Sequence, residues 1–120
     1  MDKFEQNRLL EEPTLVFAVA VVGFVTTLPK AETGAVIGRQ LVKSGTSIGS
    51  NYREANRAKF CDEYIHKTAV VLKEASETEY WLELCTRTAI GDRSQLTWLS
   101  QEAREQLAIF TTINRKAKGR

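Results

Sequence analysis

The segment from Ser44 to Asn51 constrains the fold more than any other part of this chain. It reads Ser-Gly-Thr-Ser-Ile-Gly-Ser-Asn, and seven of its eight residues are small or polar. Its composition is typical of a loop, because Gly, Ser and Asn favour turns and compete with helical hydrogen bonds. Apolar residues at helical steps nevertheless continue through it, at Ile37, Leu41 and Ile48, and no proline follows Pro29. We therefore interpret the segment as the middle of a helix.

Such a helix is intrinsically weak, because each Gly costs about 1 kcal/mol relative to Ala in a helix interior. Close packing against a neighbouring helix must stabilise it, and small side chains permit that approach. The hydroxyls of Ser44, Thr46 and Ser47 can also bond carbonyls one turn earlier. A phosphate-binding loop is the alternative, but that motif requires Lys directly after its second Gly, and here Ser50 follows Gly49. The segment therefore predicts a close helix–helix contact.

Four helical segments account for most of the chain. The first begins near Pro13, which suits a first helical turn, and ends before Pro29, which cannot continue a helix. The second follows Thr33 as its N-cap, and the fourth follows Ser94 as its N-cap, after Gly91-Asp92 has ended the third. The predicted helices are 13–28, 33–57, 59–89 and 94–115, with a polar lead-in over 1–12 and a basic tail over 115–120.

The third segment has the most regular pattern. Its apolar and small residues alternate steps of three and four, as in the seam of a helical bundle. No stretch alternates with the period of a strand, the links between segments are short, and 120 residues suit one domain. We predict an all-α fold, an antiparallel up-and-down four-helix bundle. The seam residues are Cys61, Tyr64, Thr68, Val71, Ala75, Thr78, Leu82, Cys85 and Ala89.

The run from residue 15 to residue 28 has no charge and is apolar around most of the helix. It is too short for a membrane span, which needs about 20 apolar residues, and the acidic residues before it do not suit a secretion signal. We expect a cytoplasmic protein with no membrane contact. One bundle core covers only one side of a helix. With Ala18, Val21, Val25 and Leu28 on the core side, the pattern predicts a homo-oligomer whose interface includes Phe17, Val22 and Phe24.

Residues suited to catalysis or metal binding are few. Glu63 and His66 have the spacing of a di-iron bundle site, but such a site needs this motif twice, and His66 is the only histidine. Cys61 and Cys85 would lie about 36 Å apart along one helix, far beyond disulfide reach. The glutamates between residues 74 and 83 are typical of a solvated helix face that pairs with nearby cations. We expect no enzymatic activity, no metal and no cofactor.

The cations permit two interpretations. A net charge of +2 does not by itself indicate nucleic-acid binding. On the second helix, however, Arg39 and Lys43, and then Arg53 and Arg57, are spaced four apart and could form a basic strip that an oligomer would repeat. A solvated helix face is the alternative. The candidate residues for RNA or DNA binding are Arg39, Lys43, Arg53, Arg57, Lys59, Arg115, Lys116 and Lys118.

Two runs of the sequence resemble one known family. They are LVKSGTSIGSNYREANR over 41–57 and KEASETEYWLEL over 73–84. Both are similar to the four-helix-bundle proteins encoded within bacterial 23S ribosomal RNA intervening sequences, and to related accessory proteins of diversity-generating retroelements. The most specific parts are Ser-Ile-x-x-Asn-x-x-Glu from Ser47 and the run from Glu74 to Leu82. The resemblance covers most of the chain.

The resemblance implies an up-and-down bundle that assembles into a ring-like homopentamer. For the retroelement proteins it implies that basic surface binds nucleic acid and a reverse transcriptase. Those proteins are typically more basic than this chain. We expect a non-enzymatic oligomeric scaffold or adaptor. The alternative is a nucleic-acid-binding accessory protein that acts with a reverse transcriptase or ribosomal RNA.

The motif residues also have a physical interpretation. Asn51 and Glu54 lie one turn apart on the second helix, and three polar residues of the third helix follow at three-residue steps. Polar groups placed in this way can form a buried network that fixes the register of two helices. The predicted structural network comprises Ser47, Asn51, Glu54, Glu74, Glu77 and Tyr80.

Overall fold

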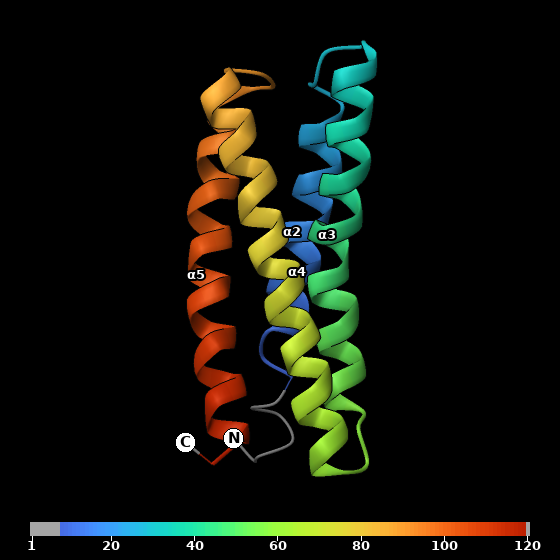
Figure 1. The fold of residues 1–120 in the computed structure, drawn as a ribbon, viewed down its shortest axis with the longest axis vertical. Coiled ribbons are helices and arrows are strands. Elements are labelled where there is room, and N and C mark those ends of the chain that lie inside the picture. The colour runs from blue at the N-terminus through green and yellow to red at the C-terminus, as the bar shows by residue number, and fades with distance from the viewer. Residues whose placement is uncertain (1–7, 120) are drawn as a thin grey trace.

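The computed structural model describes residues 8–119, which form four helices (Figure 1). They are α2 (Glu11–Val25), α3 (Glu32–Asn56), α4 (Cys61–Thr88) and α5 (Arg93–Ala117). Each helix runs antiparallel to the one before it, and short turns join them at the two ends of an elongated body of 45 × 24 × 21 Å. The predicted all-α, up-and-down four-helix bundle is therefore confirmed.

The ends of the helices differ from the predicted ranges by three residues at most. The predicted lead-in is shorter than expected, because Glu11 and Glu12 already belong to α2. Residues 1–7 of that lead-in, and Arg120 of the predicted tail, lie outside the described residues. The rest of the tail mostly continues α5, which ends at Ala117.

Both predicted N-caps are wrong. Thr33 lies inside the first turn of α3, where Ala31 occupies the cap position in extended backbone without a side-chain hydrogen bond. Ser94 lies inside α5, and Asp92 is the cap, because its carboxylate accepts a hydrogen bond from the Gln95 amide at 3.0 Å. The hydrogen bonds from Gln95 and Ser94 hold the pKa of Asp92 below its ordinary value. A carboxylate is the stronger acceptor at this place, and Ser94 donates to it.

The turn between α4 and α5 rests on the end of α2. Gly91 has a φ of 84°, and a Cβ added there would lie 2.5 Å from the Phe24 ring. The next residue, Asp92, donates its amide to the Thr27 hydroxyl at 2.8 Å. Only glycine combines this backbone conformation with such a close approach to an aromatic ring. The turn therefore closes the bundle between its first and last helices.

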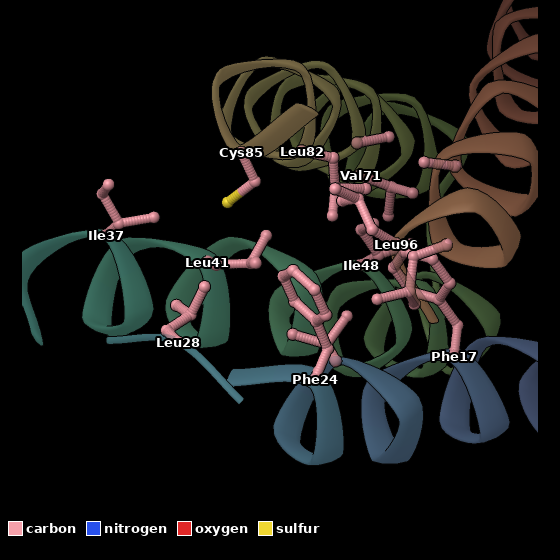
Figure 2. Packing of buried hydrophobic residues seen from close by; sticks show 14 of the residues in the cluster. Phe17, Phe24, Leu28, Ile37, Leu41, Ile48, Val71, Leu82, Cys85 and Leu96 are labelled. Atoms are coloured by element: carbon pink, nitrogen blue, oxygen red, sulfur yellow. The ribbon is translucent and has the colours of Figure 1, made fainter. Parts of the chain in front are cut away.

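One cluster of buried side chains fills the bundle along its axis (Figure 2). Phe17, Val21 and Phe24 of α2 are fully buried in it, with Leu41 and Ile48 of α3. The seam predicted for the third helix is buried from Thr68 to Cys85, whereas its two end residues are exposed. The buried seam residues of α4 are Thr68, Val71, Ala75, Thr78, Leu82 and Cys85.

The small-residue segment of α3 is helical, as predicted, and it packs closely on α2. A Cβ added at Gly45 would lie 3.0 Å from both Cγ atoms of Val21, and one at Gly49 would lie 3.0 Å from the Thr14 hydroxyl oxygen. Gly38 approaches Val25 in the same way, at 2.8 Å. The predicted close helix–helix contact is thus confirmed, and its partner is α2.

Two buried amides on α5 differ in their hydrogen bonds. The Asn114 amide nitrogen donates to the Ile65 carbonyl at 3.1 Å and to the Thr68 hydroxyl at 2.8 Å, which ties the end of α5 to the start of α4. Gln106 is equally buried, yet neither atom of its amide group has a hydrogen-bond partner within residues 8–119. Asn114 therefore fixes the register of two helices, and Gln106 does not.

Candidate self-association surface

The predicted oligomer interface on α2 needs correction. Phe17 and Phe24 are 0% exposed and belong to the core of their own chain, so they cannot contact another copy. The buried side of α2 consists of Thr14, Phe17, Val21 and Phe24, which are spaced by three or four residues. The two aromatic rings lie on the same side of the helix as Val21, which is also fully buried. Of the three predicted interface residues, only Val22 is exposed.

An apolar strip runs along the opposite side of α2. We define the α2 outer face as Leu15, Val16, Val19 and Val22, whose side chains are between 46% and 65% exposed. The uncharged run that contains them leaves the strip without a charged residue of its own. Val19, at its centre, is the most exposed of the four.

A groove begins at Val25, one helical turn beyond Val22, the last residue of this face. It has a volume of about 780 Å³ and lies between the end of α2 and the first half of α3. Aliphatic side chains from both helices make up much of its lining. The groove is also lined by three cationic residues, Lys30, Arg39 and Lys43, and by one acidic residue, Glu32. The aliphatic lining includes Val25, Leu28, Ala35 and Val42.

A second, smaller groove borders the face on the side of α5. Its volume is about 340 Å³, and it lies beside Ala20 and Gly23 of α2 and Trp98 of α5. Trp98 is nearly half exposed, although it lies next to a bundle core that covers Leu99 completely. The outer face of α2 is therefore the centre of an apolar surface with a groove on each side.

The predicted basic strip is divided between two places. Arg39 and Lys43 line the groove near the turn between α2 and α3, whereas Arg53 and Arg57 lie near the other end of α3. Eighteen residues separate Arg39 from Arg57, which is roughly 27 Å along a helix. The spacing of four within each pair does not bring the four cations together.

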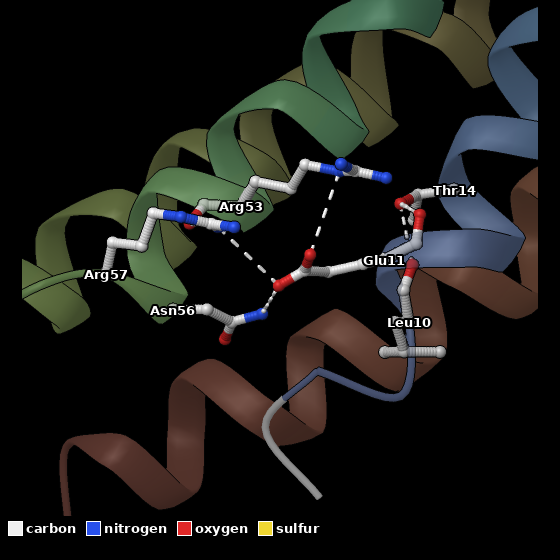
Figure 3. A network of polar contacts seen from close by, with 6 residues as sticks. All are labelled: Leu10, Glu11, Thr14, Arg53, Asn56 and Arg57. Carbon is white, nitrogen blue, oxygen red and sulfur yellow. Dashed lines mark hydrogen bonds and ion pairs between the residues drawn. The ribbon is translucent and has the colours of Figure 1, made fainter. Parts of the chain in front are cut away.

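Arg53 and Arg57 are occupied by a carboxylate (Figure 3). Glu11, at the start of α2, lies 3.8 Å from the Arg53 side chain and 3.7 Å from that of Arg57. The same carboxylate accepts a hydrogen bond from the Asn56 amide at 2.9 Å. These contacts fasten α2 to the end of α3 and neutralise part of the predicted strip. No local pattern in the sequence predicts these contacts, because Glu11 lies more than forty residues away along the chain.

The remaining candidate cations lie at the end of the bundle where α3 joins α4. Lys59 and Lys116 line one groove of about 590 Å³, together with Phe60, Cys61 and Tyr64. Phe60 is 72% exposed, the most exposed of the large apolar side chains in the described part of the chain. Arg115 and Lys118 are exposed at the same end of α5. The structure thus brings an aromatic ring and several cations together there.

The predicted polar network is not formed. No hydrogen bond joins two side chains of its six members, all of which lie in the described part of the chain. Asn51 donates to the Ser47 carbonyl at 2.8 Å and the Ser47 hydroxyl donates to the Lys43 carbonyl, so both bond only their own helix. Tyr80 is 63% exposed. Residues of this kind bond neighbouring carbonyls more readily than distant side chains.

The contact that does cross from α3 to α4 is an ion pair. Glu54 accepts from the Lys67 ammonium at 2.8 Å, and Lys67 was not among the predicted residues. Glu74 has one carboxylate oxygen that is buried without a partner in the described region. Burial and the neighbouring Glu77 raise the pKa of Glu74, although nearby lysines oppose that shift.

The two cysteines differ in their exposure. Cys61 is exposed and Cys85 is buried, both are free as expected, and burial raises the pKa of the Cys85 thiol. Among residues 8–119, no three His, Cys, Asp or Glu side chains come close enough together to hold a metal ion. None of the helices in this range combines the length and apolar character that crossing a bilayer requires.

Comparison with known proteins gives a family and a similar solved structure. A family model described as 23S rRNA-intervening sequence protein matches residues 12–112. A solved structure of a protein with unknown function, from the S23 ribosomal protein family of Bacteroides thetaiotaomicron, is 36% identical and superimposes with a TM-score of 0.81. The match covers 91% of this chain and 97% of that one. No curated protein matches the chain.

Proposed function

We propose that this chain, which belongs to the 23S rRNA-intervening sequence protein family, is a non-enzymatic scaffold that assembles with copies of itself through the α2 outer face. The observation that carries the proposal is the uncharged strip of Leu15, Val16, Val19 and Val22, left exposed on a helix whose other side is fully buried. Contiguous apolar surface of this kind marks protein–protein contact in soluble proteins. The proposed stoichiometry is five, which the family resemblance implies.

The surroundings of the strip support a packed contact. Grooves lie on both sides of it, so side chains of a second copy can insert beside the exposed valines. Completing the burial of half-exposed valine or leucine side chains contributes about 1 kcal/mol each. The larger groove is lined mainly by aliphatic side chains, which suit packing better than proton or group transfer.

Light scattering tests the proposal directly. The wild-type chain, measured over a concentration series, is expected at a multiple of its 13.5 kDa mass, and Val19→Glu is expected at the monomer mass with unchanged helix content. A charge placed at the centre of the strip would have to be buried without a partner. Phe60→Glu is the matched control, because it puts the same charge on an exposed apolar residue at the end of the bundle. A wild-type monomer throughout the series rejects the proposal.

Nucleic-acid binding is the second candidate function, and one specific observation favours it. Exposed Phe60 shares a groove with Lys59 and Lys116, and an aromatic ring beside cations suits base stacking combined with phosphate contact. We propose RNA or DNA as the partner at this end of the bundle. If the chain binds nucleic acid there, a reverse transcriptase is the proposed protein partner. Lys59→Glu with Lys116→Glu should then abolish a salt-dependent mobility shift of structured RNA, while Arg39→Glu leaves it intact. Absence of any salt-dependent shift with the wild type removes this function.

A further inference from the structure

The outer surface of α4 presents an exposed aromatic side chain on the body of the bundle. Tyr80 is 63% exposed and packs edge to face on Trp81, with ring centroids 5.1 Å apart at 85°. Beside it lies a hollow of about 490 Å³, lined by Glu79, Glu83, Leu84 and Arg87 as well as Tyr80. The Trp81 ring holds Tyr80 in place, so Tyr80 is a positioned anchor rather than a loose side chain. We call this the α4 anchor surface.

The charges around the two surfaces are opposite. Residues 30–43, along the α2–α3 groove, carry three cations and one anion, whereas residues 73–87 of α4 carry four anions and two cations. Two of the cations, Lys30 and Arg39, have no ion pair in the described part of the chain, and Glu79 has none either. The charge of Lys43 lowers the pKa of Glu74 within the same chain, so Lys43 contributes less to a contact with a second copy. Opposite charge around two apolar surfaces favours their mutual docking.

The two surfaces lie on different sides of one chain. α2 packs on α3 and α5, and α4 packs on the same two helices, so α2 and α4 are diagonal in the bundle. Figure 1 shows α4 in front of α2. A chain therefore cannot cover its own α2 outer face with its own α4 anchor surface. A second copy can do so, and each copy then still has one surface of each kind to offer.

We propose that copies of this chain join head to tail, with the α2 outer face and its cationic groove against the α4 anchor surface of the next copy. This inference rests on the proposed self-association and names the surface that covers the strip. Tyr80 enters the aliphatic groove between α2 and α3, while Glu79 faces the cations Lys30 and Arg39. Contacts between unlike surfaces close into a ring when the rotation between copies allows it.

Mixing two disabled variants tests the inference. Val19→Glu disables the α2 outer face and keeps the α4 anchor surface, and Tyr80→Glu does the reverse. Each variant alone is expected at the monomer mass. An equimolar mixture is expected to give a species of twice the chain mass, because only one intact junction can form between the two variants. Phe60→Glu, as the control, assembles like the wild type.

Each other outcome overturns the inference in an identifiable way. If Tyr80→Glu assembles like the wild type, the strip is covered by a like surface or by another protein, while the proposed self-association stands. If the mixture stays monomeric, the two surfaces do not meet. If Tyr80→Glu loses helix content, Glu79→Arg replaces it in the same mixture, because this change leaves the Tyr80–Trp81 packing intact. A monomeric wild type instead shows that the proposed self-association itself has failed.

Discussion

Glycines make the closest approaches of α3 to α2, whereas the side of α3 that bears Ser47, Asn51 and Glu54 carries hydroxyl, amide and charged groups. At Gly45 and Gly49, an added Cβ would lie 3.0 Å from atoms of α2. At Ser47 and Asn51, the side chains bond carbonyls of their own helix, and one ion pair from Glu54 crosses to α4. The first contact depends on how closely two backbones approach. The second depends on side chains that have room to move, so the two contacts should respond differently to substitution.

The largest expected effect is at the start of the α2–α3 contact, in Gly34→Ala. The added Cβ would overlap the Pro29 carbonyl oxygen and lie 3.0 Å from its carbon, and backbone atoms in a tight turn cannot move aside as a side chain can. We expect the free energy of unfolding to fall by about 3 kcal/mol or more. Urea denaturation followed by circular dichroism, at matched protein concentration, measures it.

Gly23→Ala is the control for that substitution. Nothing lies within 4 Å of a Cβ at Gly23, which is an exposed position in α2. The free energy of unfolding should therefore rise by about 0.5 to 1 kcal/mol, the helix-propensity gain of Ala over Gly. Equal effects of the two substitutions would contradict the idea that close backbone approach governs this contact.

A pair of substitutions two residues apart on α3 should have opposite signs. Gly45→Ala pushes a methyl group against Val21, and the strain should exceed the propensity gain, for a net loss of about 1 kcal/mol. Ser47→Ala removes a half-buried hydroxyl that bonds only its own helix, and should raise the free energy of unfolding by about 0.5 kcal/mol. Chemical denaturation of both variants decides the comparison, and stabilisation by Gly45→Ala would refute it.

The smallest effect concerns pH on the α4 side. The pKa of Glu74 is raised in the folded chain, so its charged form is disfavoured there at neutral pH, and the penalty disappears as the pH falls through the raised pKa. Glu74→Gln should therefore be more stable than the wild type at pH 7, by about 0.5 to 1 kcal/mol, near the lower end because water screens the exposed part of the group.

The measurement is the difference in stability between Glu74→Gln and the wild type across an acid titration. The advantage of the variant should shrink as the pH falls. Asp92 acts in the opposite direction, because its pKa is lowered and its cap loses stability on acidification, but it is present in both proteins and cancels in the difference. An advantage that grows on acidification would show that burial does not dominate at Glu74.

The sequence predicts the fold correctly where the spacing of apolar residues allows only one side of a helix to be buried. On α4, only one side of the helix can be apolar, and the predicted seam from Thr68 to Cys85 is the buried one. On α2, almost every position is apolar, so the spacing of apolar residues does not indicate which side of the helix is buried. The prediction that Phe17 and Phe24 lie outside the core is therefore wrong. Packing volume, which a one-dimensional pattern does not contain, decides that choice.

The candidate sites were less predictable because their contacts join distant parts of the chain. The spacing of Arg53 and Arg57 was visible, but the Glu11 carboxylate between them was not. The polar residues of the family motif predict a network between helices, but Ser47 and Asn51 instead donate hydrogen bonds to carbonyls of their own helix. The exposed strip on α2 was foreseen as an excess of apolar residues, and only Val22 of the predicted set belongs to it.

The hydrogen bond from the Asp92 amide to Thr27 bears on how the native bundle opens. It joins residues 65 apart in sequence, whereas the larger helix contacts are all between consecutive helices, and the α2–α5 contact is much smaller than those. Bringing together two residues so far apart in sequence has an entropic cost. This contact can also open while the other helices stay packed. Local opening of the native state should therefore begin at this seam. The Asp92 amide would then exchange with deuterium before the buried amides of α4, and α2 would be the first helix accessible to a protease.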